Sequence, residues 1–135
     1  MHVHQMISTH PDVQGSTNDV LIRCIEHCLE CAQICQSCAD ACLAEAMVAE
    51  LRQCIRLNLD CADICETTAR LAARRTGSNE QLIVEMLQLC ERACAMCAEE
   101  CERHAQKHEH CRICAETCRA CETACREAAP GITAH

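Results

Sequence analysis

The sequence contains no phenylalanine, tyrosine or tryptophan, and it has only three glycines and two prolines in 135 residues. Its core therefore lacks the aromatic side chains that usually dominate buried area. No run of eighteen apolar residues occurs, so we expect no membrane span. The formal net charge of −8 and the absence of a basic patch argue against nucleic-acid binding. The length suits a single domain with its own core.

Cysteine, by contrast, is abundant, with eighteen residues in the chain. Such density usually indicates a secreted scaffold held by disulfides. The first fifteen residues, however, carry no apolar segment typical of an export signal. The cysteines also follow a helical period and do not lie between turns. We therefore expect a cytoplasmic protein whose reduced cysteines bind metal or carry out redox chemistry.

The clearest pattern runs from Cys24 to Cys42, where cysteines recur at alternating intervals of four and three residues. Residues at these intervals share one face of an α-helix. The segment is therefore predicted to be a helix whose inward seam, normally leucine, isoleucine and valine, consists of thiols. A free cysteine behaves as a small hydrophobe, so such a seam can still pack as a core.

Similar spacing elsewhere predicts four helices joined by short connections. The first covers about residues 18–44 and takes Asn18 or Ser16 as its N-cap. A slip in the phase of the cysteine pattern places a turn near residues 44–48. The second helix ends at Gly77, which follows two arginines.

The third helix begins at a capping box over residues 78–81, and its seam continues in step to His104 and His108. A turn near residues 106–109 leads to the fourth helix, which ends at the Pro-Gly pair of residues 130–131. Four helices with short connections favour an all-α fold, an antiparallel up-down-up-down four-helix bundle.

The ends of the chain differ from the bundle in composition. Pro11 and Gly15 interrupt a polar stretch, so we expect a loose arm there. Its histidines, His2, His4 and His10, are expected to be poorly ordered. The predicted segments are an N-terminal arm at 1–15, the cysteine-lined bundle at 16–131 and a C-terminal tail at 132–135.

The antiparallel order gathers different side chains at the two ends of the bundle. One end, which we call the mouth, brings cysteines together with Met47, His104, His108 and His110. The alternative for these histidines is a solvated position at a helix end, and for Met47 it is ordinary packing. The opposite end, which we call the plug, gathers Leu21, Leu71, Ile83 and Leu87.

Thiolates are soft ligands that select Cu(I), zinc or iron–sulfur clusters. Zinc sites and iron–sulfur clusters usually take cysteines from turns or loops, whereas these cysteines lie on predicted helices. Cu(I) accepts two or three thiolates, which one or two helical turns supply, so the pattern favours a column of Cu(I) sites that share sulfur. Capacity would then approach roughly one Cu(I) per thiol.

One position on the second helix departs from the pattern, because Asn58 stands where the spacing calls for a cysteine. Its amide either fills space and forms hydrogen bonds or makes a weak contact to a neighbouring ion. The candidate metal ligands are therefore Cys24, Cys28, Cys31, Cys35, Cys38, Cys42, Cys54, Cys61, Cys65, Cys90, Cys94, Cys97, Cys101, Cys111, Cys114, Cys118, Cys121, Cys125, His104, Asn58, His108, His110 and Met47.

The chain resembles the bacterial copper storage proteins, in particular the cytosolic branch, over residues 18–129. The resemblance rests on alternating C-x3-C and C-x2-C spacing at 24–42, 90–101 and 111–125, and on a sparser set in the second helix. It implies a four-helix bundle filled with Cu(I), ligation by most of the cysteines, uptake at one polar end, and assembly into homotetramers.

The expected function is therefore storage of Cu(I), with copper buffering and detoxification as its consequence. The alternatives are a zinc or mixed-metal thiolate buffer and an iron–sulfur electron-transfer protein. No isolated cysteine stands beside an obvious base, and no Glu-x-x-His pair appears, so we expect no enzyme. The expected partners are copper ions, further copies of the chain, and a copper chaperone or small-thiol acceptor, but neither nucleic acid nor a membrane.

Overall fold

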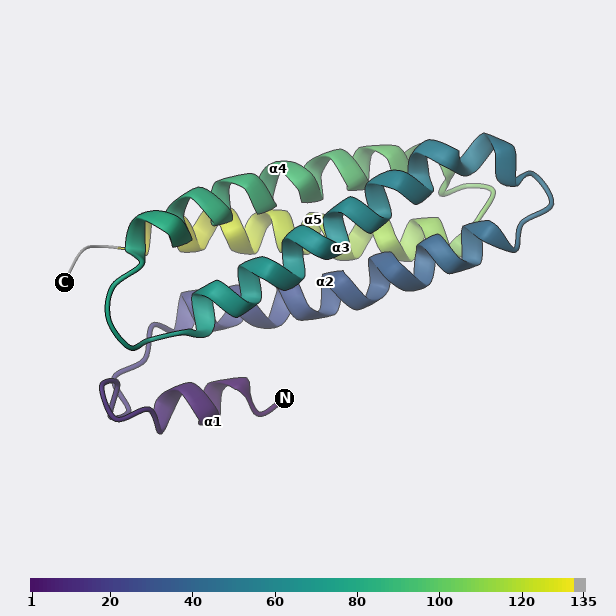
Figure 1. Cartoon of the computed structure of the whole chain (residues 1–135). Helices are drawn as coiled ribbons and strands as arrows, with labels where there is room; N and C mark the ends of the chain where they lie inside the picture. The colour runs from purple at the N-terminus through teal and green to yellow at the C-terminus, as the bar shows by residue number, and fades with distance from the viewer. Residues whose placement is uncertain (133–135) are drawn as a thin grey trace.

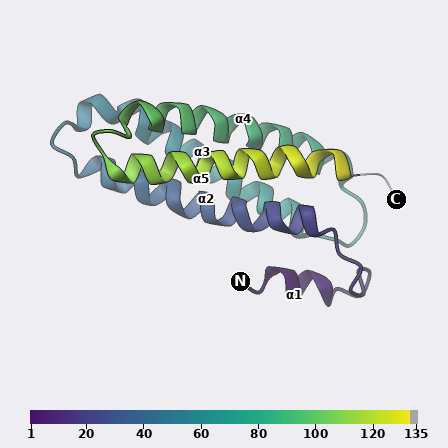
Figure 2. The same cartoon turned by 180° about the vertical axis from the view of Figure 1, so that it is seen from behind.

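A computed structural model of the chain describes residues 1–132. Four long helices form an antiparallel bundle in which each helix packs against the next along the chain, and the last returns to the first (Figures 1 and 2). The all-α up-down-up-down architecture is thus confirmed. The four are α2 (Asp19–Leu43), α3 (Arg52–Ala73), α4 (Glu80–His104) and α5 (Glu109–Ala128).

Both the N-cap of the first long helix and the turn after it are confirmed. The side chain of Asn18 accepts a hydrogen bond from the backbone N–H of Leu21 at 3.1 Å, which satisfies one of the free N–H groups at the start of α2. After α2 ends, the chain turns and passes through the short 3₁₀ helix η1 (Val48–Leu51) into α3. At the far end of α5, the Pro-Gly pair lies in η2 (Ala129–Gly131), which stops the helix as expected.

The connection between α3 and α4 corrects two predictions. Gly77 does not end α3, which stops at Ala73; the glycine instead turns the following loop with a φ of +75°. The predicted capping box does not form: the Ser78 hydroxyl donates to the Glu80 carboxylate, and within residues 1–132 no side chain accepts a hydrogen bond from the first backbone N–H groups of α4. The N-cap is Asn79, whose amide donates to the Leu71 carbonyl at 3.2 Å and so closes the loop onto α3.

The N-terminal arm is more ordered than predicted. It contains a short helix, α1 (Val3–Ser8), which lies beside α2 in both views (Figures 1 and 2). Ile7 is 8 % exposed and packs onto the core. His4 lies 3.1 Å from the Asp19 carboxylate and His10 lies 2.9 Å from the Thr76 hydroxyl, so polar contacts tie both ends of the arm to the bundle. Of the predicted tail at 132–135, residues 133–135 lie outside the described residues.

Large aliphatic side chains close the plug end as expected. Leu21, Ile83 and Leu87 are at most 2 % exposed, and Leu71 is half-buried. Leu51 is equally buried but lies on η1 near the mouth, so apolar packing is not confined to the plug. In the part of the chain that the structure describes, no helix combines the length and apolar character needed to cross a membrane.

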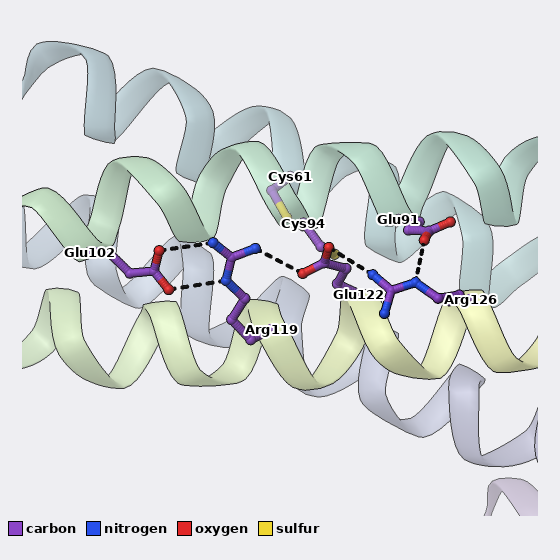
Figure 3. Close-up of polar contacts among 7 residues, drawn as sticks. All are labelled: Cys61, Glu91, Cys94, Glu102, Arg119, Glu122 and Arg126. Atoms are coloured by element: carbon purple, nitrogen blue, oxygen red, sulfur yellow. Dashed lines mark hydrogen bonds and ion pairs between the residues drawn. The ribbon is translucent and has the colours of Figure 1, made fainter.

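A ladder of ion pairs runs along the outside of α4 and α5 (Figure 3). The Arg119 guanidinium donates to both carboxylate oxygens of Glu102, at 2.8 and 3.0 Å, and to Glu122 at 3.0 Å. Arg126 continues the ladder to Glu122 at 3.0 Å and to Glu91 at 2.8 Å. Glu102 and Glu91 belong to α4 and both arginines to α5, so the ladder joins the two helices at the surface.

Candidate metal centre

All of the cysteines point into the bundle. Every one of the eighteen lies within residues 1–132, is at most 2 % exposed, and is a free thiol. The predicted thiol seam is therefore confirmed on each long helix. We call this set the thiol column; it comprises Cys24, Cys28, Cys31, Cys35, Cys38 and Cys42 from α2, Cys54, Cys61 and Cys65 from α3, Cys90, Cys94, Cys97 and Cys101 from α4, and Cys111, Cys114, Cys118, Cys121 and Cys125 from α5.

Neighbouring thiols of the column lie close enough to share ions. Many contacts between sulfurs on different helices are short, such as 3.5 Å between Cys35 and Cys118 and 3.9 Å between Cys28 and Cys90. Several groups of four thiols have all sulfurs within 4.8 Å of one another, and the groups overlap. The overlapping groups are Cys28/Cys90/Cys121/Cys125, Cys31/Cys65/Cys94/Cys121, Cys31/Cys35/Cys61/Cys118 and Cys35/Cys97/Cys114/Cys118.

These distances fit bound soft metal with little rearrangement. Taking about 2.3 Å for a metal–thiolate bond, two sulfurs on one ion lie about 3.8 Å apart in a tetrahedral site, about 4.0 Å in a trigonal site and about 4.6 Å in a linear site. The observed separations therefore need to change by no more than about 1 Å, which side-chain rotation supplies. Because the groups share members, the column suits connected metal clusters better than isolated single-ion sites.

Asn58 sits inside the column. It is 0 % exposed, and its Oδ1 accepts hydrogen bonds from the thiols of Cys97 at 3.0 Å, Cys114 at 3.2 Å and Cys101 at 3.5 Å. Its amide nitrogen also lies 3.7 Å from the Cys54 sulfur. The hydrogen-bonding role is confirmed. The weak contact to an ion stays a prediction.

At the mouth, His110 joins the thiols. Its Nδ1 lies 3.5 Å from the Cys38 sulfur and 3.6 Å from the Cys111 sulfur. Together with Cys42 these residues offer one nitrogen and three sulfur atoms, all within 4.8 Å of one another. We call this group the inner site. It lies where α5 begins beside the end of α2, as the antiparallel order predicts.

Glu45 completes the mouth, although it is not among the predicted ligands. Its Oε2 lies 2.8 Å from His110 Nε2 and 3.0 Å from His108 Nδ1, and the two imidazole rings stack with centroids 5.5 Å apart. The hydrogen bond with His110 lowers the pKa of Glu45 below its usual range. Glu45 follows Cys42 by three residues, so the helical spacing was the available signal.

The remaining predicted mouth residues are placed less centrally. His104 ends α4, and its Nε2 lies 2.9 Å from the Glu100 carboxylate. The pKa of Cys54 is lowered mainly by its hydrogen bond with Cys101, and the electrostatic effect of His104 lowers it further. His108 was predicted to continue the seam of α4, but α4 ends before it and His108 is the N-cap residue of α5. Met47 is 57 % exposed, so it is not packed into the thiol column. Ligand roles for these three stay predictions.

Burial sets the protonation of two thiols of the inner site, Cys42 and Cys111. It raises the pKa of Cys42 to about 11 and also raises the pKa of Cys111. These thiols are therefore neutral at physiological pH in the metal-free protein. Each ion that binds them must displace a proton, because the thiolate is the ligand.

A four-helix bundle whose interior is a continuous column of thiols, with imidazoles and a carboxylate at one end, defines a soft-metal-binding helical protein. The family described as Csp, copper storage protein, matches residues 17–130, which is most of the chain. The chain therefore belongs to the copper storage protein family.

Solved structures agree with this assignment. The copper storage protein Ccsp from Streptomyces lividans, loaded with 10 copper equivalents, is 50 % identical with a TM-score of 0.91, over 96 % of this chain and 98 % of that one. A cytosolic copper storage protein from the same organism with five coppers is 52 % identical with a TM-score of 0.83, over 85 % and 96 %. A Streptomyces lividans Ccsp mutant with one histidine replaced by alanine is 50 % identical with a TM-score of 0.84, and the match covers 87 % of this chain and 98 % of that one. No curated protein matches the chain at a significant level.

Proposed function

We propose that this protein stores multiple Cu(I) ions in the cytosol on the thiolates of its core, and thereby buffers and detoxifies copper. The observation that carries the proposal is the thiol column itself, in which eighteen buried cysteines line the bundle and at least twelve of them belong to overlapping groups of four. A structural metal site needs only four such ligands. Eighteen cysteines far exceed that number, which suits the storage of many ions.

Charge balance favours a monovalent ion. Eighteen buried thiolates without counter-ions would be prohibitively expensive to desolvate. One Cu(I) per thiolate makes the column neutral. A divalent ion on four thiolates leaves two net negative charges at each site, and residues 1–132 include no buried cation to offset them. The similar Streptomyces proteins, which are described with five and 10 coppers, support multiple occupancy.

The two ends of the bundle suggest how the cargo moves. The plug is closed by aliphatic side chains, whereas the mouth offers imidazole nitrogens that lead to the inner site. Ions are taken up at the mouth, where His104, His108, His110 and Met47 assist, and they pass inward by exchange between neighbouring thiolates. Asn58 contacts ions weakly, since an amide oxygen is a hard ligand.

The partners follow from this role and from the family. The donor or acceptor of copper is a chaperone protein or a small thiol, whose sulfur competes with the column for each ion. The protein assembles into homotetramers, and it stores metal without acting as an enzyme. Neither nucleic acid nor a membrane takes part.

Anaerobic titration with Cu(I) against a chromogenic chelator, followed by native mass spectrometry, tests the proposal. We expect saturation far above four equivalents, near one Cu(I) per thiol, and the mass of a tetramer. Saturation at four equivalents or fewer contradicts storage. A preference for zinc under competition favours the thiolate-buffer alternative, and acid-labile sulfide with a brown chromophore favours an iron–sulfur protein.

A further inference from the structure

The mouth contains a second, harder group of ligands outside the inner site. It consists of Glu45 Oε2, His108 Nδ1 and His110 Nε2, and we call it the outer site. One carboxylate oxygen lies 2.8 Å and 3.0 Å from the two nitrogens. Two ligands bound at right angles, each about 2.0–2.1 Å from one ion, lie about 2.8–3.0 Å apart. The carboxylate oxygen therefore already lies at ligand spacing from each of the two imidazole nitrogens.

The ligand types select the ion. Two imidazoles and a carboxylate suit divalent transition metals in a tetragonal geometry, and among these Cu(II) binds most tightly in the Irving–Williams order. Cu(I) instead prefers the sulfur ligands of the inner site. The side chains of His108, His110 and Glu45 are 16 %, 25 % and 32 % exposed, so the outer site is open to ions arriving from solvent.

His110 connects the two sites through one ring. Its Nε2 faces Glu45, whereas its Nδ1 lies within 3.6 Å of the Cys38 and Cys111 sulfurs. The outer site and the nearest thiols are therefore separated only by the imidazole ring of His110. Thiolates reduce Cu(II) to Cu(I), and they are also the ligands that keep Cu(I).

We infer that the mouth captures Cu(II) at the outer site and reduces it with thiols of the inner site. Two Cu(II) ions each gain one electron, and two thiols lose their protons to solvent as their sulfurs join in a disulfide: 2 Cu(II) + 2 Cys–SH → 2 Cu(I) + Cys–S–S–Cys + 2 H⁺. The sulfurs of Cys38, Cys42 and Cys111 lie within 4.8 Å of one another. We expect the disulfide to join Cys111 on α5 to Cys38 or Cys42 on α2, because His110 Nδ1 lies close to the Cys111 and Cys38 sulfurs, at 3.6 and 3.5 Å. A low-mass thiol then reduces this disulfide by exchange and becomes oxidised itself.

This activity extends the proposed storage function, on which it rests for the fate of the Cu(I) formed. It lets the protein accept copper in the oxidised state without a separate reductase. It also assigns a role to Glu45, which is not among the predicted ligands.

The test mixes the fully reduced protein anaerobically with two equivalents of cupric sulfate. Freeze-quench EPR follows the loss of Cu(II), and alkylation with peptide mass spectrometry locates lost thiols. The variants are Glu45→Ala, Glu45→Gln, which keeps the side-chain size, and His108→Ala. The matched control is Glu50→Ala, an exposed glutamate at the same end of the bundle. Circular dichroism confirms that each variant is folded.

We expect Cu(II) to disappear about ten- to a hundredfold more slowly in the three outer-site variants than in the wild type and the control, because loss of one supporting group usually costs that much in metal affinity or activity. One disulfide should form per two Cu(II), and it should contain Cys111. Equal rates in all folded variants, or disulfides scattered along the column, overturn the inference. A parallel Cu(I) titration of the wild type separates Cu(II) reduction from Cu(I) storage. If the Cu(I) capacity is high but the Cu(II) experiment fails, the inference about the mouth is wrong and the proposed storage function stands.

Discussion

Replacing Leu87 by alanine should destabilise the metal-free protein more than most single changes. Leu87 is 0 % exposed at the plug, in a core that has no aromatic side chains. Truncating a fully buried leucine costs about 2–5 kcal/mol, through lost burial and the cavity that remains. A typical domain is stable by only about 5–15 kcal/mol. A loss near the middle of the first range should lower Tm by roughly 10 °C for a chain of this size.

Thermal and urea unfolding followed by circular dichroism, under anaerobic reducing conditions, measure this effect. Leu82→Ala is the matched control, because Leu82 lies on the same helix but is 57 % exposed, and its loss should change stability by no more than about 0.5 kcal/mol. Copper should raise the Tm of both variants alike, since an ion that binds only the folded state adds about 4 kcal/mol at a thousand times its Kd. If Leu87→Ala unfolds within 1 °C of the control, the plug does not hold the empty bundle together.

Three further results are expected. Burial raises the pKa of Cys42 to about 11, so this thiol should contribute its full share of stability to the metal-free protein below the unfolded thiol pKa of about 8.5. That contribution should be lost as the pH rises from about 8.5 toward 11, whereas the copper-loaded protein should not lose it. Urea unfolding at several pH values tests this. Asn58→Leu should leave copper capacity unchanged by mass spectrometry, and a loss of ions would make Oδ1 a ligand. Arg119→Ala should cost about 1 kcal/mol or less in urea unfolding, because its ion pairs are partly exposed.

Periodic patterns in the sequence predicted the bundle and the thiol column well. A period of three and four residues sets which face of a helix points inward, and in this chain cysteine marks that face on all four helices. The mouth and the plug followed from the antiparallel order alone. The slip in phase after Cys42 also predicted the turn, which the structure places directly after Leu43.

What the sequence did not predict depends on contacts between segments far apart in the chain. Glu45 looks like an ordinary residue at a helix end until the loop between α4 and α5 brings His108 and His110 to it. The arm is ordered by contacts with the bundle, where Ile7 packs onto the core and His4 and His10 reach Asp19 and Thr76. Ser78 begins a good capping sequence, but the Asn79 side chain bonds to Leu71 and moves the cap one residue on.

Placing the ligands on helices explains why the interior of this protein combines sulfur with so few large side chains. Loops that carry metal ligands usually order only when the ion binds, so folding and loading become one event. A storage protein must instead hold its shape while empty, part-filled and full. Cysteine packs as a small hydrophobe, so it contributes less buried area than leucine at each seam position. The plug residues and the Arg119–Glu102 ladder then stabilise the empty bundle from outside the column, which leaves every thiol free for cargo.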